Sequence, residues 1–462
     1  MHSNPDPMSL DRRTLLKKVG LGLPALGLVS LMEQDAAGQA KQRPHFQARA
    51  KHVVHLFMNG GPSQVDTFDP KPELAKWHGK DIGSLSLRTE RRTGAPMQSP
   101  FHFRRHGESG IAVSELFSQT AQHIDDIAVI RSMYAEVPNH EPSLMLMNCG
   151  DTQLPRPSMG SWITYGLGSE NRNLPGFIAM CPGGYPIVST RNWRSSFLPG
   201  AYQGTYLNTQ HSDIDKLIEN IKSKKTGTTQ QARQLQLFRQ LNRHHQQKHS
   251  NAPELESRIR SFEMAFRMQT EAAEAFDLSR ETKGTLGMYG DTTIGRQLLL
   301  TRRLIERGVR FIQAWSGAGQ PWDNHSGLEA EHRKLAGQWD GPIAAFINDL
   351  KQRGLFDETL ILWGGEFGRT PVAELPALNG RDHNHYGFSV WLAGGGVRGG
   401  TVHGATDDLG FRAIENPTSV HDLHATILHL LGLDHKRLTY RFAGRDFRLT
   451  DVHGEVIQSV LG

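Results

Sequence analysis

The chain has 462 residues, of which 37% are hydrophobic and 21% are charged, so it has enough apolar material for a core and wholesale disorder is excluded. Only 2 cysteines occur, which excludes a disulfide scaffold and a cysteine-rich zinc finger. The formal net charge of +5, from 52 basic and 47 acidic residues without a long basic run, does not indicate binding to nucleic acid.

The first forty residues have the layout of an export signal. A pair of arginines at 12–13 precedes an apolar stretch at 19–32, and small residues follow up to Ala40. The apolar stretch is too short and too interrupted by Gly and Pro for a stable membrane span. We therefore expect residues 1–40 to be a cleaved twin-arginine signal and the mature protein to be periplasmic or extracellular, with an ordinary N-terminal helix as the alternative.

Five short apolar segments predict buried strands, at residues 51–58, 127–130, 309–315, 359–363 and 388–393. Apolar residues at helical spacing predict helices at 293–307 and 341–353. Because strands alternate with helices, we expect an α/β fold with a mainly parallel central sheet sandwiched by helices.

Residues 208–285 differ from the rest of the chain in composition. They are rich in Gln, Arg, Glu and His and poor in Gly and Pro. The segments 230–247 and 255–275 predict surface helices. We expect this region to be a helical insertion or cap within a single domain that spans residues 41–462.

Polar side chains follow two of the predicted strands. Asp323 and His325 come after the third strand and a Gly-rich turn, and Glu366 comes directly after the fourth. The carboxyl ends of parallel strands meet at one edge of a sheet, where α/β proteins bind ligands. We expect Asp323, His325 and Glu366 to bind a divalent metal ion, either zinc, calcium or manganese. A hydrogen-bonded turn, or for Glu366 an ion pair with Arg369, is the alternative.

The densest group of imidazoles directly precedes the fifth predicted strand. His383 and His385 follow Asp382 in what the sequence predicts to be a loop. Two imidazoles and a carboxylate in four residues are a typical metal-ligand grouping. We include both histidines among the candidate metal ligands.

Two further residues are candidate catalytic groups. The Arg369 guanidinium has the geometry to hold an oxyanion through two parallel hydrogen bonds. His140 precedes an apolar helical run, and a helix N-terminus favours anions. His140 is therefore a candidate ligand, base or nucleophile, unless Asn139 or Ser143 simply caps that helix.

Other polar residues favour structural roles or leave the role open. Asp66 and Asp69 suit either a metal site or a turn. His421, His424 and His429, at spacings of three and eight, lie near one face of a predicted packing helix.

Several of these motifs together resemble a known family. They are the twin-arginine start and the segments 59–71, 364–371, 380–383 and 442–446. On these motifs the chain looks like the secreted bacterial family called domain of unknown function 1501, over nearly the whole mature chain. That family is placed in the alkaline phosphatase and sulfatase superfamily, and segments 140–150 and 422–432 are similar to sulfatase motifs. The resemblance implies an alkaline phosphatase/sulfatase-like fold and a metal site.

The chain also departs from the sulfatase pattern. His140 stands at the nucleophile position, Leu144 replaces the motif Arg, Glu366-Phe367 replaces an Asp-His pair, and Asn59 stands where the superfamily has its first-strand Asp. One hypothesis is an exported metal-dependent hydrolase that attacks small-molecule or glycan esters of phosphate or sulfate with an activated water. The other is a non-catalytic envelope or glycan-binding protein on the same fold. Convergence of the candidate residues within ligand distance favours the first hypothesis.

Overall fold

The structure is a computed structural model that describes residues 44–83, 89–171, 173–218 and 273–462, together with scattered residues between 230 and 268. The predicted signal at 1–40 lies outside the described residues. So does most of the predicted insertion at 208–285, including nearly all of its two predicted helices.

A nine-stranded sheet runs through the centre of the described chain, in the order β13-β5-β12-β9-β1-β8-β6-β7, with β16 also paired to β5. Its strands are β1 (His52–Phe57), β5 (Ile127–Tyr134), β6 (Phe177–Met180), β7 (Thr205–Leu207), β8 (Phe311–Trp315), β9 (Thr359–Gly364), β12 (Phe388–Ala393), β13 (Thr401–His403) and β16 (Thr418–Ser419). Only β12 runs antiparallel to its neighbours in this sheet. The predicted mainly parallel sheet is confirmed, and each of the five predicted strands is present.

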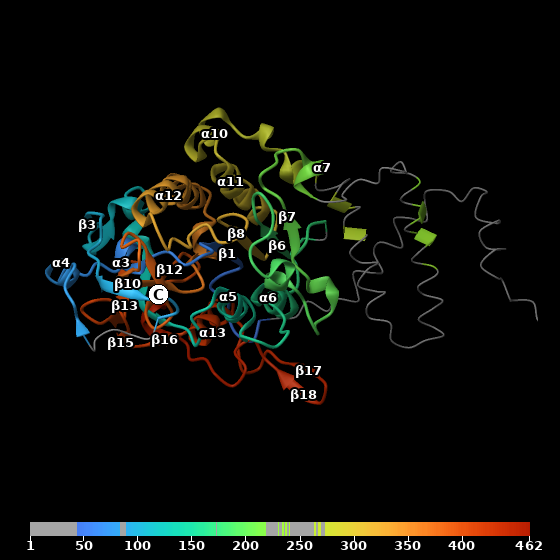
Figure 1. Cartoon of the computed structure of the whole chain (residues 1–462). Coiled ribbons are helices and arrows are strands. Elements are labelled where there is room, and N and C mark those ends of the chain that lie inside the picture. Colours follow the sequence, from blue (N-terminus) through green and yellow to red (C-terminus); the bar gives the residue numbers. More distant parts are fainter. Residues whose placement is uncertain are drawn as a thin grey trace, which may run out of the picture. The chain divides into compact units, whose positions relative to one another are not determined.

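Helices cover both faces of this sheet, as the sequence predicts (Figure 1). On one face lie α10 (Lys283–Tyr289), α11 (Thr293–Ile305) and α12 (Leu328–Gln352); on the other lie α5 (His140–Cys149), α6 (Met159–Leu167) and α13 (Val420–Leu430). The strands are apolar on both faces, and a separate hydrophobic core lies on each side of the sheet. In β1, Val54 and Leu56 belong to the core that includes α11 and α12, and Val53 and Phe57 belong to the core that includes α5, α6 and α13. This pattern is typical of a strand buried between two helical layers.

A second, three-stranded antiparallel sheet contains the motifs that follow β9. It has the order β11-β10-β2, with bounds β2 (Thr93–Pro96), β10 (Gly368–Glu374) and β11 (Arg381–Asn384). The expectation that Asp382 and His383 lie in a loop is therefore wrong, because β10 supplies β11 with a pairing partner. A buried ion pair of 2.7 Å between Asp66 and Arg381 fixes β11 to the helix α3 (Gln64–Thr67).

The remaining described elements are short. They are the helices α4 (Glu73–Trp77) and α7 (Ile214–Leu217) and the paired strands β3 (Phe103–His106) with β4 (Ile111–Ser114), β14 (Ala405–Thr406) with β15 (Ala413–Glu415), and β17 (Tyr440–Phe442) with β18 (Arg445–Phe447).

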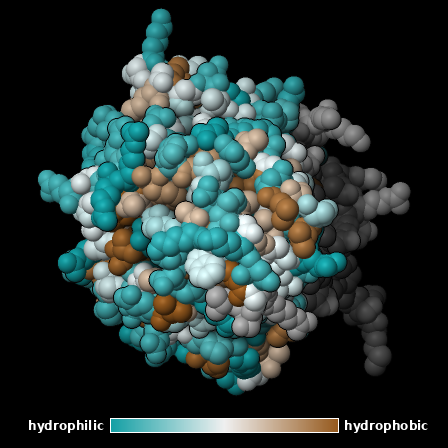
Figure 2. Space-filling view, turned by 60° about the vertical axis from the view of Figure 1, so that its left-hand side comes forward, coloured by the Kyte–Doolittle hydropathy of each residue, from teal (hydrophilic) through white to brown (hydrophobic). Residues whose placement is uncertain are grey.

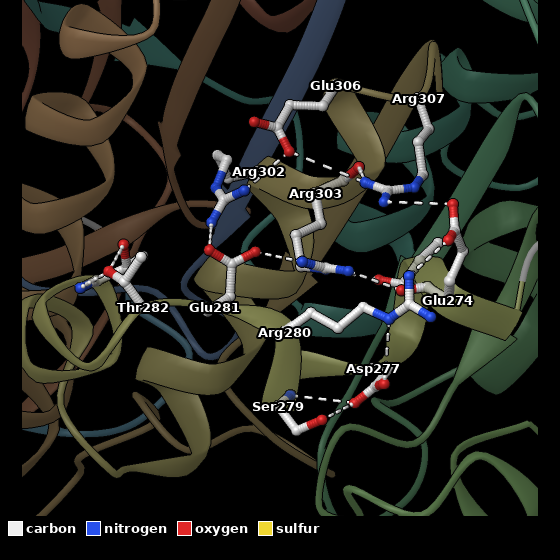
Figure 3. Close-up of polar contacts among 12 residues, drawn as sticks. Glu274, Asp277, Ser279, Arg280, Glu281, Thr282, Arg302, Arg303, Glu306 and Arg307 are labelled. Atoms are coloured by element: carbon white, nitrogen blue, oxygen red, sulfur yellow. Dashed lines mark hydrogen bonds and ion pairs between the residues drawn. The ribbon is translucent and has the colours of Figure 1, made fainter.

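A network of ion pairs joins residues 274–281 to the helix α11 (Figure 3). Glu281 binds both Arg302, at 2.5 Å, and Arg303 of α11. Arg302 also contacts Asp349 of α12 at 3.0 Å, and its side chain is 1% exposed. Burial acts to raise the pKa of Glu281, but its bonds to the two arginines outweigh burial and lower it. Glu281 is therefore charged at neutral pH, and its ion pairs join residues 274–281 to α11.

The face shown in Figure 2 is mostly hydrophilic, with hydrophobic residues in small, separate groups. Scattered apolar residues of this kind are normal on a protein surface. Among the described helices, none combines the length and the apolar character that a membrane span requires.

Candidate functional site

The site lies beyond the carboxyl ends of β1, β8 and β9. The loop after β8 carries Asp323 and His325, and Glu366 lies between β9 and β10. His140 is the first residue of α5, and His383 lies on β11. The structure brings these five predicted residues together from segments that are far apart in the sequence.

Three imidazoles converge on one carboxylate oxygen. Oδ1 of Asp323 lies 3.3 Å from Nε2 of His140, 2.8 Å from Nε2 of His325 and 3.2 Å from Nε2 of His383. The Nε2 atoms of His140 and His325 are buried, yet neither makes a well-directed hydrogen bond. The three histidines therefore direct the same ring nitrogen, Nε2, toward Asp323 Oδ1, and the Nε2 atoms of His140 and His325 are left without a hydrogen bond to any described residue.

The other nitrogen of each ring contacts a glutamate. Nδ1 of His140 lies 2.6 Å from Glu366 and Nδ1 of His383 lies 2.6 Å from Glu90. Nδ1 of His325 contacts Glu374. A carboxylate beside Nδ1 favours the tautomer with the proton on Nδ1, which leaves a lone pair on Nε2. This arrangement is typical of histidines that bind a metal ion.

A glycine makes room for the first of these glutamates. The Gly60 amide donates to both carboxylate oxygens of Glu366, at 3.0 and 3.2 Å. Gly60 has a φ of +109°, and a Cβ at this position would lie 2.5 Å from the Asp323 amide nitrogen. A side chain here would thus push the loop after β1 away from the loop that carries Asp323.

Arg369, predicted to hold an oxyanion, is committed to the loops around it. Its side chain is buried, and it donates from Nε to the Gly61 carbonyl at 2.9 Å and from Nη1 to the Arg381 carbonyl at 3.3 Å. Nη2 contacts Asp323 Oδ1 at 2.7 Å and the Gly60 carbonyl. In this geometry Arg369 positions Asp323. A direct role toward an oxyanion stays a prediction.

The local field favours positive charge at His140, whereas burial and the charges of Arg369 and His140 lower the pKa of His383. Burial acts to raise the pKa of Asp323, but contacts with the three imidazoles and the charge of Arg369 hold that pKa far below its usual value. Burial acts to lower the pKa of His140, but contacts with Asp323 and Glu366 outweigh burial and raise it. The carboxylates that favour an imidazolium also favour a metal cation.

The donor set fits a metal ion. One ligand atom from each of His140, Asp323 and His383 lies within 4.8 Å of the others, and His325, Asp382 and His383 meet the same criterion. A tetrahedral ion with bonds of about 2.0–2.1 Å places its ligand atoms roughly 3.3–3.4 Å apart. The separations of 3.3 and 3.2 Å between Asp323 and the nitrogens of His140 and His383 match this spacing. The 2.8 Å between Asp323 and His325 is shorter, and His325 shares a group with Asp382 and His383 but not with His140.

His385 is placed elsewhere. The strand β11 ends at Asn384, and the His385 ring packs against Tyr386 at a centroid distance of 3.9 Å. His385 belongs to neither of the two groups that bring possible ligand atoms together. Burial and the charge of Arg412 lower its pKa to about 4, so it is neutral at pH 7.

The residues left open in the sequence have structural partners. Asn59 is held by the loop after β8, donating to the carbonyls of Gly317 and Gly319. Asp69 contacts Lys71 at 3.1 Å. His424 of α13 contacts the Met147 carbonyl at 2.8 Å, consistent with the predicted packing helix. Both cysteines, Cys149 and Cys181, are free and buried.

Sequence reasoning missed Glu90 and Glu374. Glu374 ends β10 and pairs in register with Thr93 of β2, so the small sheet brings it near the segment of Glu90. Neither glutamate lies at a strand end of the central sheet. Their approach to the histidines depends on pairing between β2, β10 and β11, for which the sequence offered no periodic signal.

Comparison with known proteins identifies a family. The family described as "Protein of unknown function (DUF1501)" matches residues 50–461. A comparison with curated proteins gives no match.

Solved structures with similar folds include a sulfatase from Pseudoalteromonas sp., with 10% sequence identity, coverage of 89% of this chain and 72% of that chain, and a TM-score of 0.35. A phosphonate monoester hydrolase from Silicibacter pomeroyi has 12% identity, coverage of 84% and 73%, and a TM-score of 0.34. The alkaline phosphatase of the Antarctic bacterium TAB5 has 10% identity, coverage of 75% and 92%, and a TM-score of 0.33. At these values, conclusions about chemistry depend on the site itself.

Proposed function

The chain belongs to the DUF1501 family, and we propose that it is a metal-dependent hydrolase of phosphate or sulfate esters. The observation that carries this proposal is the set of three glutamate–histidine pairs whose Nε2 atoms converge on Asp323. The proposed ligands are His140, His325, His383 and Asp323. Glu366, which the sequence suggests as a ligand, would instead orient His140.

The ligand chemistry favours zinc among the three candidate ions. Calcium prefers six to eight oxygen ligands, whereas imidazole nitrogen suits zinc and other transition metals. When bound, such an ion supplies a polarised ester oxygen or a water of lowered pKa. The chain's own residues hold that position: Glu366 and Glu374 hydrogen-bond to the rings of His140 and His325, Glu90 lies beside Nδ1 of His383, and Arg369 contacts Asp323.

The surroundings support an anionic ester as substrate. His140 is the first residue of the ten-residue helix α5, and the free N-terminal amides of such a helix favour an anion. The Asp323 side chain is 20% exposed, so the cluster is open to solvent. Since both ring nitrogens of His140 already face carboxylates, we assign it to the ligand set and not to covalent attack on the substrate.

Residues 1–40 complete the proposal. Their twin-arginine layout supports export of the folded protein to the periplasm or beyond. A metal site whose four proposed ligands come from three separate segments requires a folded chain, and this export route carries folded proteins. The substrate would then be a small-molecule or glycan ester outside the cytoplasm.

The test measures metal content and hydrolysis on the same preparation. We expect stoichiometric zinc by plasma mass spectrometry, turnover of p-nitrophenyl phosphate or p-nitrophenyl sulfate, and loss of both in His383→Ala. His211→Ala, which changes an exposed histidine, is the matched control. Metal binding without turnover of any ester would instead favour the non-catalytic binding protein, and a folded protein without metal would refute the proposal.

A further inference from the structure

A hollow of about 230 Å³ lies where the end of β5 meets the segment after β11, and we call it the Arg412 hollow. Its lining consists of Tyr134, Ala135, Tyr386, Arg412, Ala413 and Pro417. Pockets for drug-sized ligands measure about 300–1,000 Å³. The Arg412 hollow is below this range, so its size suits one ring and not an oligomer.

Backbone hydrogen bonds fix the walls of the hollow. The Ala135 amide donates to the His385 carbonyl at 2.8 Å, and the Ala413 amide donates to the Tyr386 carbonyl at 2.9 Å. Pro417, another wall residue, has a restricted backbone. A ligand would therefore meet a wall that is already ordered, which reduces the entropic cost of binding.

Aromatic rings and one guanidinium provide the chemistry of the hollow. The Arg412 guanidinium lies over the Tyr386 ring at 4.9 Å, and Tyr134 is 38% exposed. Behind Tyr386, the buried His385 ring has an Nδ1 atom without a hydrogen-bond partner in the described part of the chain. Flat aromatic faces suit a ring, and a guanidinium suits a carboxylate or sulfate.

The charges around the hollow place the anion at the Arg412 end. No ion pair of the Arg412 side chain occurs among the described residues, and the carboxylate of Asp407 is engaged by backbone amides that include that of Arg412. At the other end, burial raises the pKa of Tyr134, and the charges of Asp422 and Glu136 raise it further. An anionic group would thus be attracted to Arg412 and repelled from Tyr134.

The hollow is within reach of the metal-ligand cluster. Tyr386 follows the proposed ligand His383 by three residues, and three residues of extended chain span at most about 11 Å. A substrate that spans this distance would place its ester at the histidines and a ring in the hollow.

We propose that the Arg412 hollow binds a six-membered ring that carries its own carboxylate or sulfate, as in an acidic sugar. This inference rests on the proposed function in one respect: the bound ring would be the alcohol part of the ester that is hydrolysed. Binding at Arg412 uses a charge-assisted pair, and the ring packs on the exposed Tyr134.

Saturation-transfer NMR on the zinc-treated protein, residues 41–462, tests this site with methyl β-D-glucuronide as the probe. Methyl β-D-glucoside has the same ring without the carboxylate. We expect the glucuronide to bind and the glucoside to bind about tenfold more weakly, because one charge-assisted hydrogen bond is lost. Arg412→Ala should weaken glucuronide binding by a similar factor, and Arg412→Lys should weaken it less.

Arg104→Ala is the matched control, since Arg104 is also exposed and lies on β3 outside the hollow. Equal affinity for the two probes, no binding of the glucuronide, or unchanged binding in Arg412→Ala would each overturn the inference. Neither probe is a phosphate or sulfate ester, so the result does not depend on turnover. Loss of the proposed function would appear separately, as absent metal or absent ester hydrolysis.

Discussion

Nδ1 of His140 lies 2.6 Å from a carboxylate oxygen of Glu366, and the Glu366 side chain is fully buried. The Glu366 side chain reaches the Gly60 amide and the His140 ring together. On the proposed assignment, Glu366 orients the ligand His140 through the ring nitrogen that does not face the metal ion.

Removing the charge of Glu366 should weaken metal binding. In Glu366→Gln the amide oxygen still accepts from His140, but the ring loses its anionic partner. We expect metal affinity to fall about 10–100-fold, the usual effect of changing such a partner. Competition with a chelating dye measures this change. Glu358→Gln, in an exposed pair with Lys51, is the control and should bind metal like the wild type.

The two histidines of the His383–His385 segment should behave differently. His383→Ala removes one of the three converging nitrogens and should abolish stoichiometric zinc binding. His385→Ala should retain it, because the His385 ring packs on Tyr386 outside the cluster. Elemental analysis of both variants decides the matter. Equal zinc loss in both would show that the ligand set differs from the one proposed here.

Gly60→Ala should damage both the fold and the site. The alanine would hold a φ of +109° with its Cβ 2.5 Å from the Asp323 nitrogen. We expect a loss of more than about 2 kcal/mol in the free energy of unfolding, from backbone strain together with the clash.

Gly79→Ala provides the comparison for that variant. Gly79 also has a positive φ, of +72°, but no neighbouring atom lies within 4 Å of an added Cβ. It should show only the smaller strain cost, about 1 kcal/mol. Denaturant unfolding measures both variants, and equal losses would show that the contact with Asp323 is unimportant.

Glu281→Gln should destabilise the fold away from the site. It removes the charged partner of Arg303, whereas Arg302 keeps its ion pairs with Asp349 and Glu306. Breaking a buried ion pair on one side costs about 3–5 kcal/mol. Glu331→Gln, in an exposed pair with Lys334, should cost less than about 1 kcal/mol. A shift of equal size in the two unfolding curves would contradict this account of the network.

The same glutamate should contribute to acid sensitivity. Its folded-state pKa is lowered, so its stabilising contribution is fully present above the usual glutamate pKa of about 4.3 and is lost as the pH falls through the folded-state value. Between pH 5 and pH 3, on the order of these pKa values, the stability of the wild type should therefore fall more steeply than that of Glu281→Gln. Parallel curves would show that Glu281 does not titrate as described.

The central sheet could be predicted because its strands are continuous apolar runs that end at glycine-rich turns. The same logic located Asp323, His325 and Glu366 at strand ends. It failed at β10 and β11, where short strands carry charged residues, Gly and Pro, and where pairing between distant segments decides the structure. The assignments of Glu90 and Glu374 depend on that pairing. The placement of His385 depends on β11 ending one residue earlier.

The central claim is that three imidazole nitrogens bind one metal ion. X-ray absorption at the zinc edge, on metal-loaded protein, measures the ligand shell directly. The account predicts three imidazole nitrogens at about 2.0–2.1 Å, with oxygen completing the shell. A shell of oxygen alone, or a folded protein that takes up no zinc, would contradict it.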